Sequence, residues 1–94
     1  MTAWPPAKIT LRLVINGRVQ GVYFRHSMRR EALGLAIAGW VRNRSDGSVE
    51  AVVHGDSVAV DMIVRWANRG PEMAQVEQVE IFPHEGEFAN FEII

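Results

Sequence analysis

Apolar residues occupy every second position from Ile9 to Ile15, and most positions between them carry polar side chains. Alternation with a period of two is typical of a β-strand that presents one face to the protein interior. Such a strand must bury its apolar face against other elements of the fold. The chain has 94 residues and no cysteine, so we expect one domain stabilised by burial and hydrogen bonds, without disulfides.

The residues after this strand are typical of an α-helix. Phe24, Met28 and Ala32 recur at every fourth position and form one apolar stripe. We expect this helix to extend from residue 24 to residue 33, and Gly34 is suited to end it. A stripe of this kind is what a helix buries when it packs on a sheet.

Asp46-Gly47 is a strong turn signal in the middle of the chain. The runs 39–43 and 47–53 flank it, so they are expected to pair as a β-hairpin. A second helix is expected from about residue 58 to residue 69, with Ser57 as its N-terminal cap. The polar residues of this helix gather in one wedge of the helical wheel, which again indicates packing on a sheet.

The last part of the chain predicts two more strands, around residues 76–81 and residues 91–93. The element order is therefore β-α-β-β-α-β with a short C-terminal strand. Right-handed crossovers and one central hairpin give the ferredoxin-like split βαβ fold, an α+β arrangement in which an antiparallel sheet carries two helices on one face. We expect residues 8–94 to form this domain and residues 1–7 to form a short lead-in. The topology hosts many unrelated functions, so it does not decide between them.

Charge and hydropathy argue against several classes of function. Ten Lys and Arg against eleven Asp and Glu give a net charge of −1, so the basic field that attracts nucleic acid is missing. The longest nearly unbroken apolar run, residues 35–41, is far shorter than the roughly 20 residues that span a membrane. The N-terminus does not match a signal peptide. We therefore expect a cytoplasmic protein that binds neither nucleic acid nor a membrane.

The common cofactor, metal and catalytic patterns are also missing. Gly17 and Gly21 are too close together for a Walker loop, and no G-x-G-x-x-G is present. The three histidines are far apart in the sequence and no cysteine accompanies them, so no local pair of zinc ligands exists. The histidines and scattered serines form no recognisable catalytic triad. The sequence therefore predicts neither a metal site nor a cofactor site.

The segment between the first strand and the first helix is the first candidate site. A glycine-flanked turn that leads into a helix leaves backbone N–H groups without partners, and the helix dipole favours an anion there. Arg25 lies in the first helical turn, where a cation opposes that dipole. Two interpretations stay open. Arg25 is an exposed and solvated side chain, or its planar guanidinium clamps a phosphate or carboxylate.

Asn43 is the second candidate. It stands shortly before the Asp46-Gly47 turn, where asparagine is an ordinary turn former. Asn43-Arg44-Ser45 also matches the N-glycosylation pattern, which means little without a signal peptide. In the split βαβ fold the first two strands need not be far apart. Asn43 would then place a side-chain amide beside the glycine-flanked loop.

Two long motifs resemble the acylphosphatase family. Residues 17–25 resemble the signature G-x-V-Q-G-V-x-F-R, and residues 39–50 resemble the family's second block, G-W-V-x-N-x-x-D-G-x-V-E. The resemblance spans residues 8–94, nearly the whole chain. It implies a ferredoxin-like fold and hydrolysis of small-molecule acyl phosphates to a carboxylate and inorganic phosphate, with no metal and no cofactor.

The resemblance also implies roles for individual residues. Arg25 would bind the phosphoryl group, and Asn43 would orient the attacking water. Backbone amides would complete the cradle for the anion, from Arg18, Val19, Gln20, Gly21, Val22, Tyr23 and Phe24. Inorganic phosphate or sulfate would fit the same cradle. No apolar repeat suggests a partner chain, so we expect a monomer.

Other functions remain as alternatives. The domain could recognise an anionic metabolite without turnover, or it could resemble the acylphosphatase-like domain of the larger hydrogenase-maturation carbamoyltransferases. Because the chain ends soon after the predicted domain, we expect a free-standing enzyme. An RNA-binding sheet would need paired aromatic residues on a central strand and a basic surface. Residues 49–53 contain no aromatic residue, which argues against it.

Overall fold

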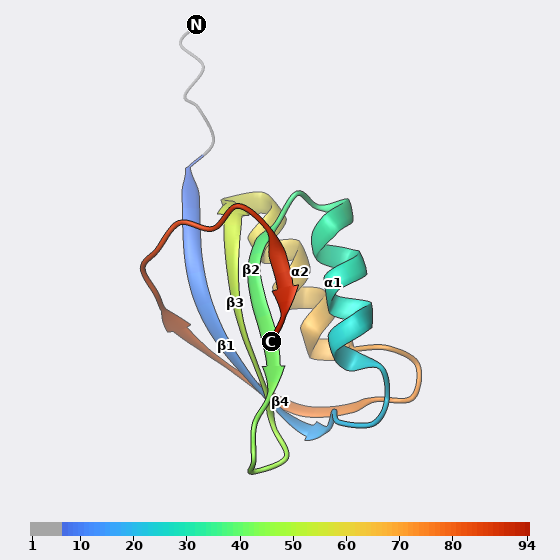
Figure 1. The fold of residues 1–94 in the computed structure, drawn as a ribbon. Coiled ribbons are helices and arrows are strands. Elements are labelled where there is room, and N and C mark those ends of the chain that lie inside the picture. Colours follow the sequence, from blue (N-terminus) through green and yellow to red (C-terminus); the bar gives the residue numbers. More distant parts are fainter. Residues whose placement is uncertain (1–6) are drawn as a thin grey trace, which may run out of the picture.

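The computed structural model describes residues 7–94, which form five strands and two helices (Figure 1). The elements are β1 (Lys8–Arg18), α1 (Phe24–Gly34), β2 (Ala38–Asn43), β3 (Val49–Asp56), α2 (Ser57–Arg69), β4 (Gln75–Pro83) and β5 (Phe91–Ile93). Their order confirms the predicted arrangement. The predicted lead-in, residues 1–7, lies outside the described residues except for Ala7.

The strands form one sheet in the order β4-β1-β3-β2-β5, and both helices cover the same face (Figure 1). The prediction of an antiparallel sheet is wrong at one edge, because β5 pairs parallel with β2. The chain leaves β4 at one end of the sheet, crosses along that end and enters β5 there. β5 therefore runs opposite to β4 and in the same direction as β2. The sheet is mixed.

The helix ends differ from the prediction in two places. Ser57 was expected to cap α2, but its amide donates to the carbonyl of Ala7 at 2.9 Å and Asp56 takes the cap position. Gly34 was expected to end α1, but it is the last helical residue, and the left-handed residue is Ala36 (φ 55°). The amide of Ile37 then returns to the carbonyl of Ala32 at 2.8 Å, which closes a Schellman-type end.

The core lies between the sheet and the two helices. α1 buries Phe24, Met28 and Ala32, as predicted, and α2 buries Val60, Ile63 and Ala67. The sheet contributes buried residues from its three central strands, among them Leu13, Ile15, Val41, Ala51 and Val53. The rings of Phe24 and Trp66 lie 5.2 Å apart between their centroids, a packing that joins the two helices. Phe24 thereby fixes the beginning of α1 on the core.

Gly39 allows β2 to approach β3 at a point where no side chain fits. Its φ is +133°, and a Cβ placed there would overlap the carbonyl oxygen of Val52. Gly34 is a matched control because a Cβ at this helical position meets nothing within 4 Å. The first glycine is required by geometry, whereas the second is not.

Gly39→Ala is expected to lower the free energy of unfolding by at least about 2 kcal/mol, because the backbone must shift to relieve strain and overlap. Gly34→Ala is expected to raise it by about 0.5–1 kcal/mol, since alanine restricts the unfolded chain and favours helix. Urea unfolding of both variants and the wild type measures this. Equal stability of the two variants would contradict the account of Gly39.

Candidate functional site

The loop that follows β1 and the end of β2 lie at the same edge of the sheet, the lower end in Figure 1. β1 and β2 both run antiparallel to β3, which lies between them, so their C-terminal ends point the same way. Ile15, Val49 and Asn43 form one row across the three strands. The topology therefore brings Asn43 to the edge that carries the β1–α1 loop (residues 19–23).

Apolar side chains anchor the β1–α1 loop to the core. Val19 and Val22 are 1% and 3% exposed, and the adjoining Phe24 is 1% exposed. Gly21 (φ 74°) and Tyr23 (φ 62°) are left-handed, which turns the chain sharply into α1. Tyr23 is the N-cap residue, and its side chain makes no capping hydrogen bond. The first backbone amides of α1 therefore have no side-chain acceptor from the cap residue. Turns of this kind direct successive amides into a concave, anion-binding surface.

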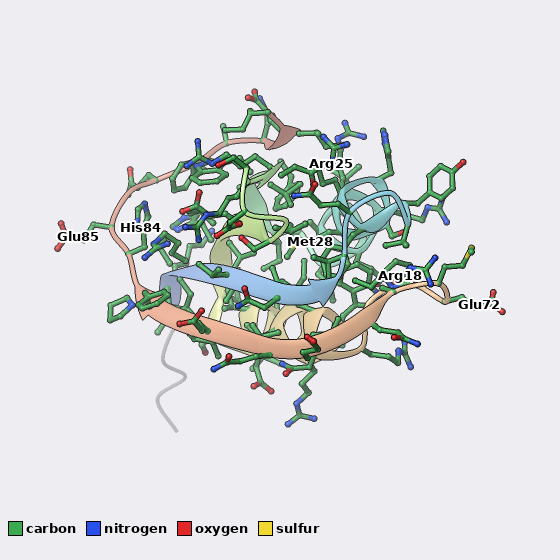
Figure 2. All side chains as sticks on the ribbon, turned by 90° about the horizontal axis from the view of Figure 1, so that it is seen from below. Arg18, Arg25, Met28, Glu72, His84 and Glu85 are labelled. Carbon is green, nitrogen blue, oxygen red and sulfur yellow. The ribbon has the colours of Figure 1, made fainter. Side chains whose placement is uncertain are left out.

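A cavity of about 330 Å³ lies between this loop, the first turn of α1 and the end of β2. It is lined by Val19, Gly21, Tyr23, Phe24, Arg25, His26 and Asn43. Figure 2 views this end of the molecule, with Arg25 labelled near the start of α1 and the buried Met28 on the same helix. Small-molecule sites measure about 300–1,000 Å³, so the cavity suits a small ligand.

Arg25 is a cation without an anion. It is half-buried, and within residues 7–94 no carboxylate or carbonyl forms a salt bridge or hydrogen bond with its side chain. α1 has no acidic residue in its first turn. Both the unpaired amides and the helix dipole repel a cation at this position. A bound anion would satisfy the guanidinium and the amides together.

The side-chain oxygen of Asn43 is also unsatisfied. Its Oδ1 is buried and has no hydrogen-bond partner among the described residues. Leaving a buried acceptor unpaired costs about 1–3 kcal/mol, so such groups usually have a function. Asn43 also lines the cavity, so its side-chain amide lies beside the space that a ligand would occupy.

Gln20 lies between two residues that line the cavity, but its own side chain points to the hairpin. Its Nε2 donates to the carbonyl of Arg44 at 2.8 Å and to the carbonyl of Ser48 at 2.9 Å. These residues begin and end the β2–β3 turn (residues 44–48). The sequence motif marks Gln20 but gives no sign of these acceptors, because they are backbone groups.

Arg18 and Val22, whose backbone amides were expected to contribute to the cradle, are not among the residues that line the cavity. Arg18 is the last residue of β1 and pairs with Gln75 of β4. His26 does line the cavity, although the sequence did not mark it as a site residue. Its position next to Arg25 was the one available signal.

Asp46 stabilises the β2–β3 turn. Its Oδ1 accepts hydrogen bonds from the hydroxyl and the amide of Ser48, and these bonds lower the pKa of Asp46. The amide of Arg44 donates to the carbonyl of Ser48 at 2.8 Å across the turn. The turn that follows Asn43 is therefore internally bonded and has a defined shape.

Three arginines of β1, β2 and the β2–β3 turn have acidic partners. Arg42 and Arg12 donate to the two carboxylate oxygens of Glu50 at 2.7 Å and 3.0 Å, on the face of the sheet opposite the helices. Burial alone would raise the pKa of Glu50, but the hydrogen bonds and charges of the two arginines outweigh it and keep the pKa below the usual value. Arg44 lies 3.6 Å from Asp46. Arg25 differs from these three arginines in having no such partner.

A larger hollow of about 490 Å³ lies between α1 and β5. The guanidinium of Arg29, one of its lining residues, donates to the carbonyl of Phe91 at 3.2 Å. This hollow therefore presents an engaged cation, whereas the smaller cavity presents unsatisfied groups. Within residues 7–94 no cluster of three or more potential ligands for a metal ion occurs. The two helices of this segment are also too short or too polar to cross a membrane.

Comparison with known proteins finds similar sequences and similar structures in one family. The sequence model of a family described as Acylphosphatase matches residues 11–93. A protein of Thiobacillus denitrificans named Acylphosphatase is 60% identical over 83 residues, which make up 88% of this chain and 93% of that protein. The structure of an acylphosphatase from Coxiella burnetii superimposes with a TM-score of 0.89 at 32% identity and covers 93% of both chains. An acylphosphatase from Bacillus subtilis gives 0.87 at 32% identity, over 92% of this chain and 98% of the other.

Glu50→Gln is expected to lower the free energy of unfolding at neutral pH by about 1–2 kcal/mol, because two charge-assisted hydrogen bonds weaken. The native pKa of Glu50 lies below its usual value of 4.5, so the carboxylate stabilises the fold above that pH and loses its effect as the pH falls further. Wild type and variant should therefore converge in acid. Urea unfolding at several pH values measures the difference, with the exposed Glu72→Gln as control. A difference that is constant with pH would refute this account.

Proposed function

Because the chain belongs to the acylphosphatase family and hydrolyses the carboxyl-phosphate bond of acyl phosphates, we propose that Arg25 binds the phosphoryl group and that Asn43 positions the attacking water. The observation that carries this proposal is the shared cavity. Two unsatisfied polar side chains, one cationic and one neutral, line the same space of about 330 Å³. One is suited to an anion and the other to water.

The phosphoryl group would be bound by charge and by backbone amides together. In phosphoryl transfer, negative charge spreads over the three equatorial oxygens of the transferred group. The guanidinium of Arg25 offers two parallel donors to such oxygens. The amides of the β1–α1 loop and of the first turn of α1 would add further donors, favoured by the helix dipole. Donors that are fixed before the reaction lower the barrier without reorganisation.

Asn43 would hold a water molecule in line with the bond that breaks. A carboxamide has one acceptor and two donor hydrogens, so it can orient water without taking its proton. The water oxygen attacks phosphorus, the bond between phosphorus and the carboxyl oxygen breaks, and the carboxylate leaves with the bonding electron pair. We assign the released proton to a phosphoryl oxygen of the substrate. The products are a carboxylate and inorganic phosphate.

The leaving group explains why so few catalytic groups are needed. A carboxylate is the conjugate base of an acid with a pKa of about 4, so it departs without protonation. A general acid is therefore unnecessary, and positioning together with electrostatic stabilisation suffices. On this chemistry the proposed reaction needs neither a metal ion nor an organic cofactor.

The proposal extends to the setting in which the enzyme acts. Residues 8–94 would form the catalytic domain, and the site is built from one chain, which favours action as a monomer. The substrate is a small molecule, and inorganic phosphate or sulfate would bind as a product or product analogue. Charged phosphate compounds cross apolar layers poorly. Acyl phosphates made inside the cell therefore stay there, which supports a cytoplasmic location.

Asn43→Ala is expected to lower kcat for benzoyl phosphate by about 10²–10³, the effect of losing one preorganised group. Inhibition by inorganic phosphate should change little, because the guanidinium and the amides remain. Steady-state kinetics measures both quantities. Asn68→Ala is the matched control, since this amide lies exposed on α2 and bonds only the carbonyl of Val64 in the described residues. An Asn43 variant with wild-type kcat would remove this residue from the mechanism.

Arg25→Lys is expected to abolish both turnover and phosphate inhibition, each by at least about 100-fold. Lysine keeps the charge but loses the planar pair of donors that matches a phosphoryl group. Arg30→Lys is the control, because Arg30 is an exposed arginine of the same helix. If Arg25→Lys keeps the wild-type inhibition constant for phosphate, the phosphoryl group is bound elsewhere.

A further inference from the structure

We propose that Gln20 is a positioning residue that keeps Asn43 opposite the phosphoryl-binding groups. Its side chain links the β1–α1 loop, which carries those groups, to the β2–β3 turn, which follows Asn43 directly. The inference rests on the role proposed above for Asn43. The role proposed here belongs to the side chain of Gln20, which bonds the hairpin. The role in the anion cradle belongs to its backbone amide.

The link reaches the β2–β3 turn one residue beyond the last paired residues of β2 and β3. In the register of β2 and β3, Asn43 pairs with Val49. Arg44 follows Asn43 and Ser48 precedes Val49, and the carbonyls of these two residues accept the hydrogen bonds from Gln20 at 2.8 Å and 2.9 Å. A shift of the loop relative to the turn would therefore be a shift of the loop relative to Asn43.

Asn43 depends on its backbone for its position. Its Oδ1 has no hydrogen-bond partner in the described residues, so no such bond fixes this end of the side chain. Gln20 joins two rigid parts of the structure. One is the β1–α1 loop, which Val19 and Val22 anchor to the core, and the other is the β2–β3 turn, which is bonded internally through Asp46. Within residues 7–94 the two bonds of Gln20 are the side-chain hydrogen bonds that connect them.

The same geometry argues against the side chain of Gln20 as a phosphate ligand. A carboxamide nitrogen carries two hydrogens, and here two carbonyl oxygens accept from it. No donor is left for a phosphoryl oxygen. The remaining polar atom, Oε1, is an acceptor with partial negative charge and would repel an anion. The side chain therefore serves the protein, and the ligand is left to Arg25 and the backbone.

The test is a double-mutant cycle in kcat for benzoyl phosphate. Gln20→Met removes both donors and keeps a side chain of similar length. We expect kcat to fall about 10- to 100-fold, the effect of misplacing a reacting group by a fraction of an ångström to an ångström. The inhibition constant for inorganic phosphate should stay within about twofold. In the Asn43→Ala background the same substitution should lower kcat less than about twofold, because the group it positions is gone.

Asn16→Ala is the control for loss of a side-chain amide from β1, the strand that leads into the β1–α1 loop. Its Nδ2 donates to Glu80 of β4, away from the hairpin, so kcat should not change. Gln20→Glu tests the link independently if the Met variant does not fold. At neutral pH its carboxylate would face two carbonyl oxygens, and protonation would restore one donor. Its kcat relative to wild type at the same pH should therefore rise as the pH falls.

Three results would overturn the inference. The first is a Gln20→Met enzyme with wild-type kcat. The second is a Gln20→Met enzyme in which phosphate inhibition weakens as much as turnover falls, because the side chain would then act on phosphate binding. The third is an equal loss from Gln20→Met with and without Asn43, which would indicate a general structural role. A fully active Asn43→Ala enzyme is a different outcome, since it would refute the proposed function itself.

Discussion

The pairing of β3 with both β1 and β2 is the constraint on which the site depends. Because both neighbours run antiparallel to the same strand, their C-terminal ends meet at one edge of the sheet. The buried residues Val49, Ala51 and Val53 lie on β3, at 0% exposure, so the central strand that fixes this register is also the best packed. A slip of one residue would turn every side chain of a strand to the opposite face, and Asn43 would turn away from the cavity.

Within residues 7–94, acidic side chains neutralise several arginines of the fold, but none of them bonds a polar side chain that lines the cavity. Glu50 neutralises two arginines on the far face of the sheet, and Asp46 is engaged in its own turn. Arg25, the oxygen of Asn43 and the amides around the left-handed Tyr23 remain without comparable partners in the described residues. Unsatisfied groups lower stability, and their collection in one cavity is typical of a preorganised site. The same groups would then stabilise the charge that develops on the phosphoryl oxygens.

Much of this arrangement could be predicted from the sequence, because it rests on local patterns. The alternation in β1, the stripe of Phe24, Met28 and Ala32 and the Asp46-Gly47 turn all lie within short segments. The parallel pairing of β5 could not be predicted, since three residues carry no signal for strand direction. The prediction that Ser57 caps α2 was wrong for a similar reason. The amide of Ser57 is bonded to the carbonyl of Ala7, a partner that only the folded chain brings near. The motifs marked the site residues, but not which of their atoms face the cavity.

Gln20 shows why a motif and a mechanism are different kinds of information. Sheets twist, and neighbouring strands rotate by roughly 20–25° relative to one another, so the ends of β1 and β2 move apart or together with small changes in twist. Packing of the core tolerates such changes better than in-line attack does, since a misplacement of about 1 Å can slow a reaction 100-fold. The side chain of Gln20 bonds both ends of the β2–β3 turn and so limits this motion at the end of the sheet that carries the cavity, where a shift would misplace Asn43. The rigidity that catalysis needs is therefore supplied locally, by one amide, on a fold whose core does not require it.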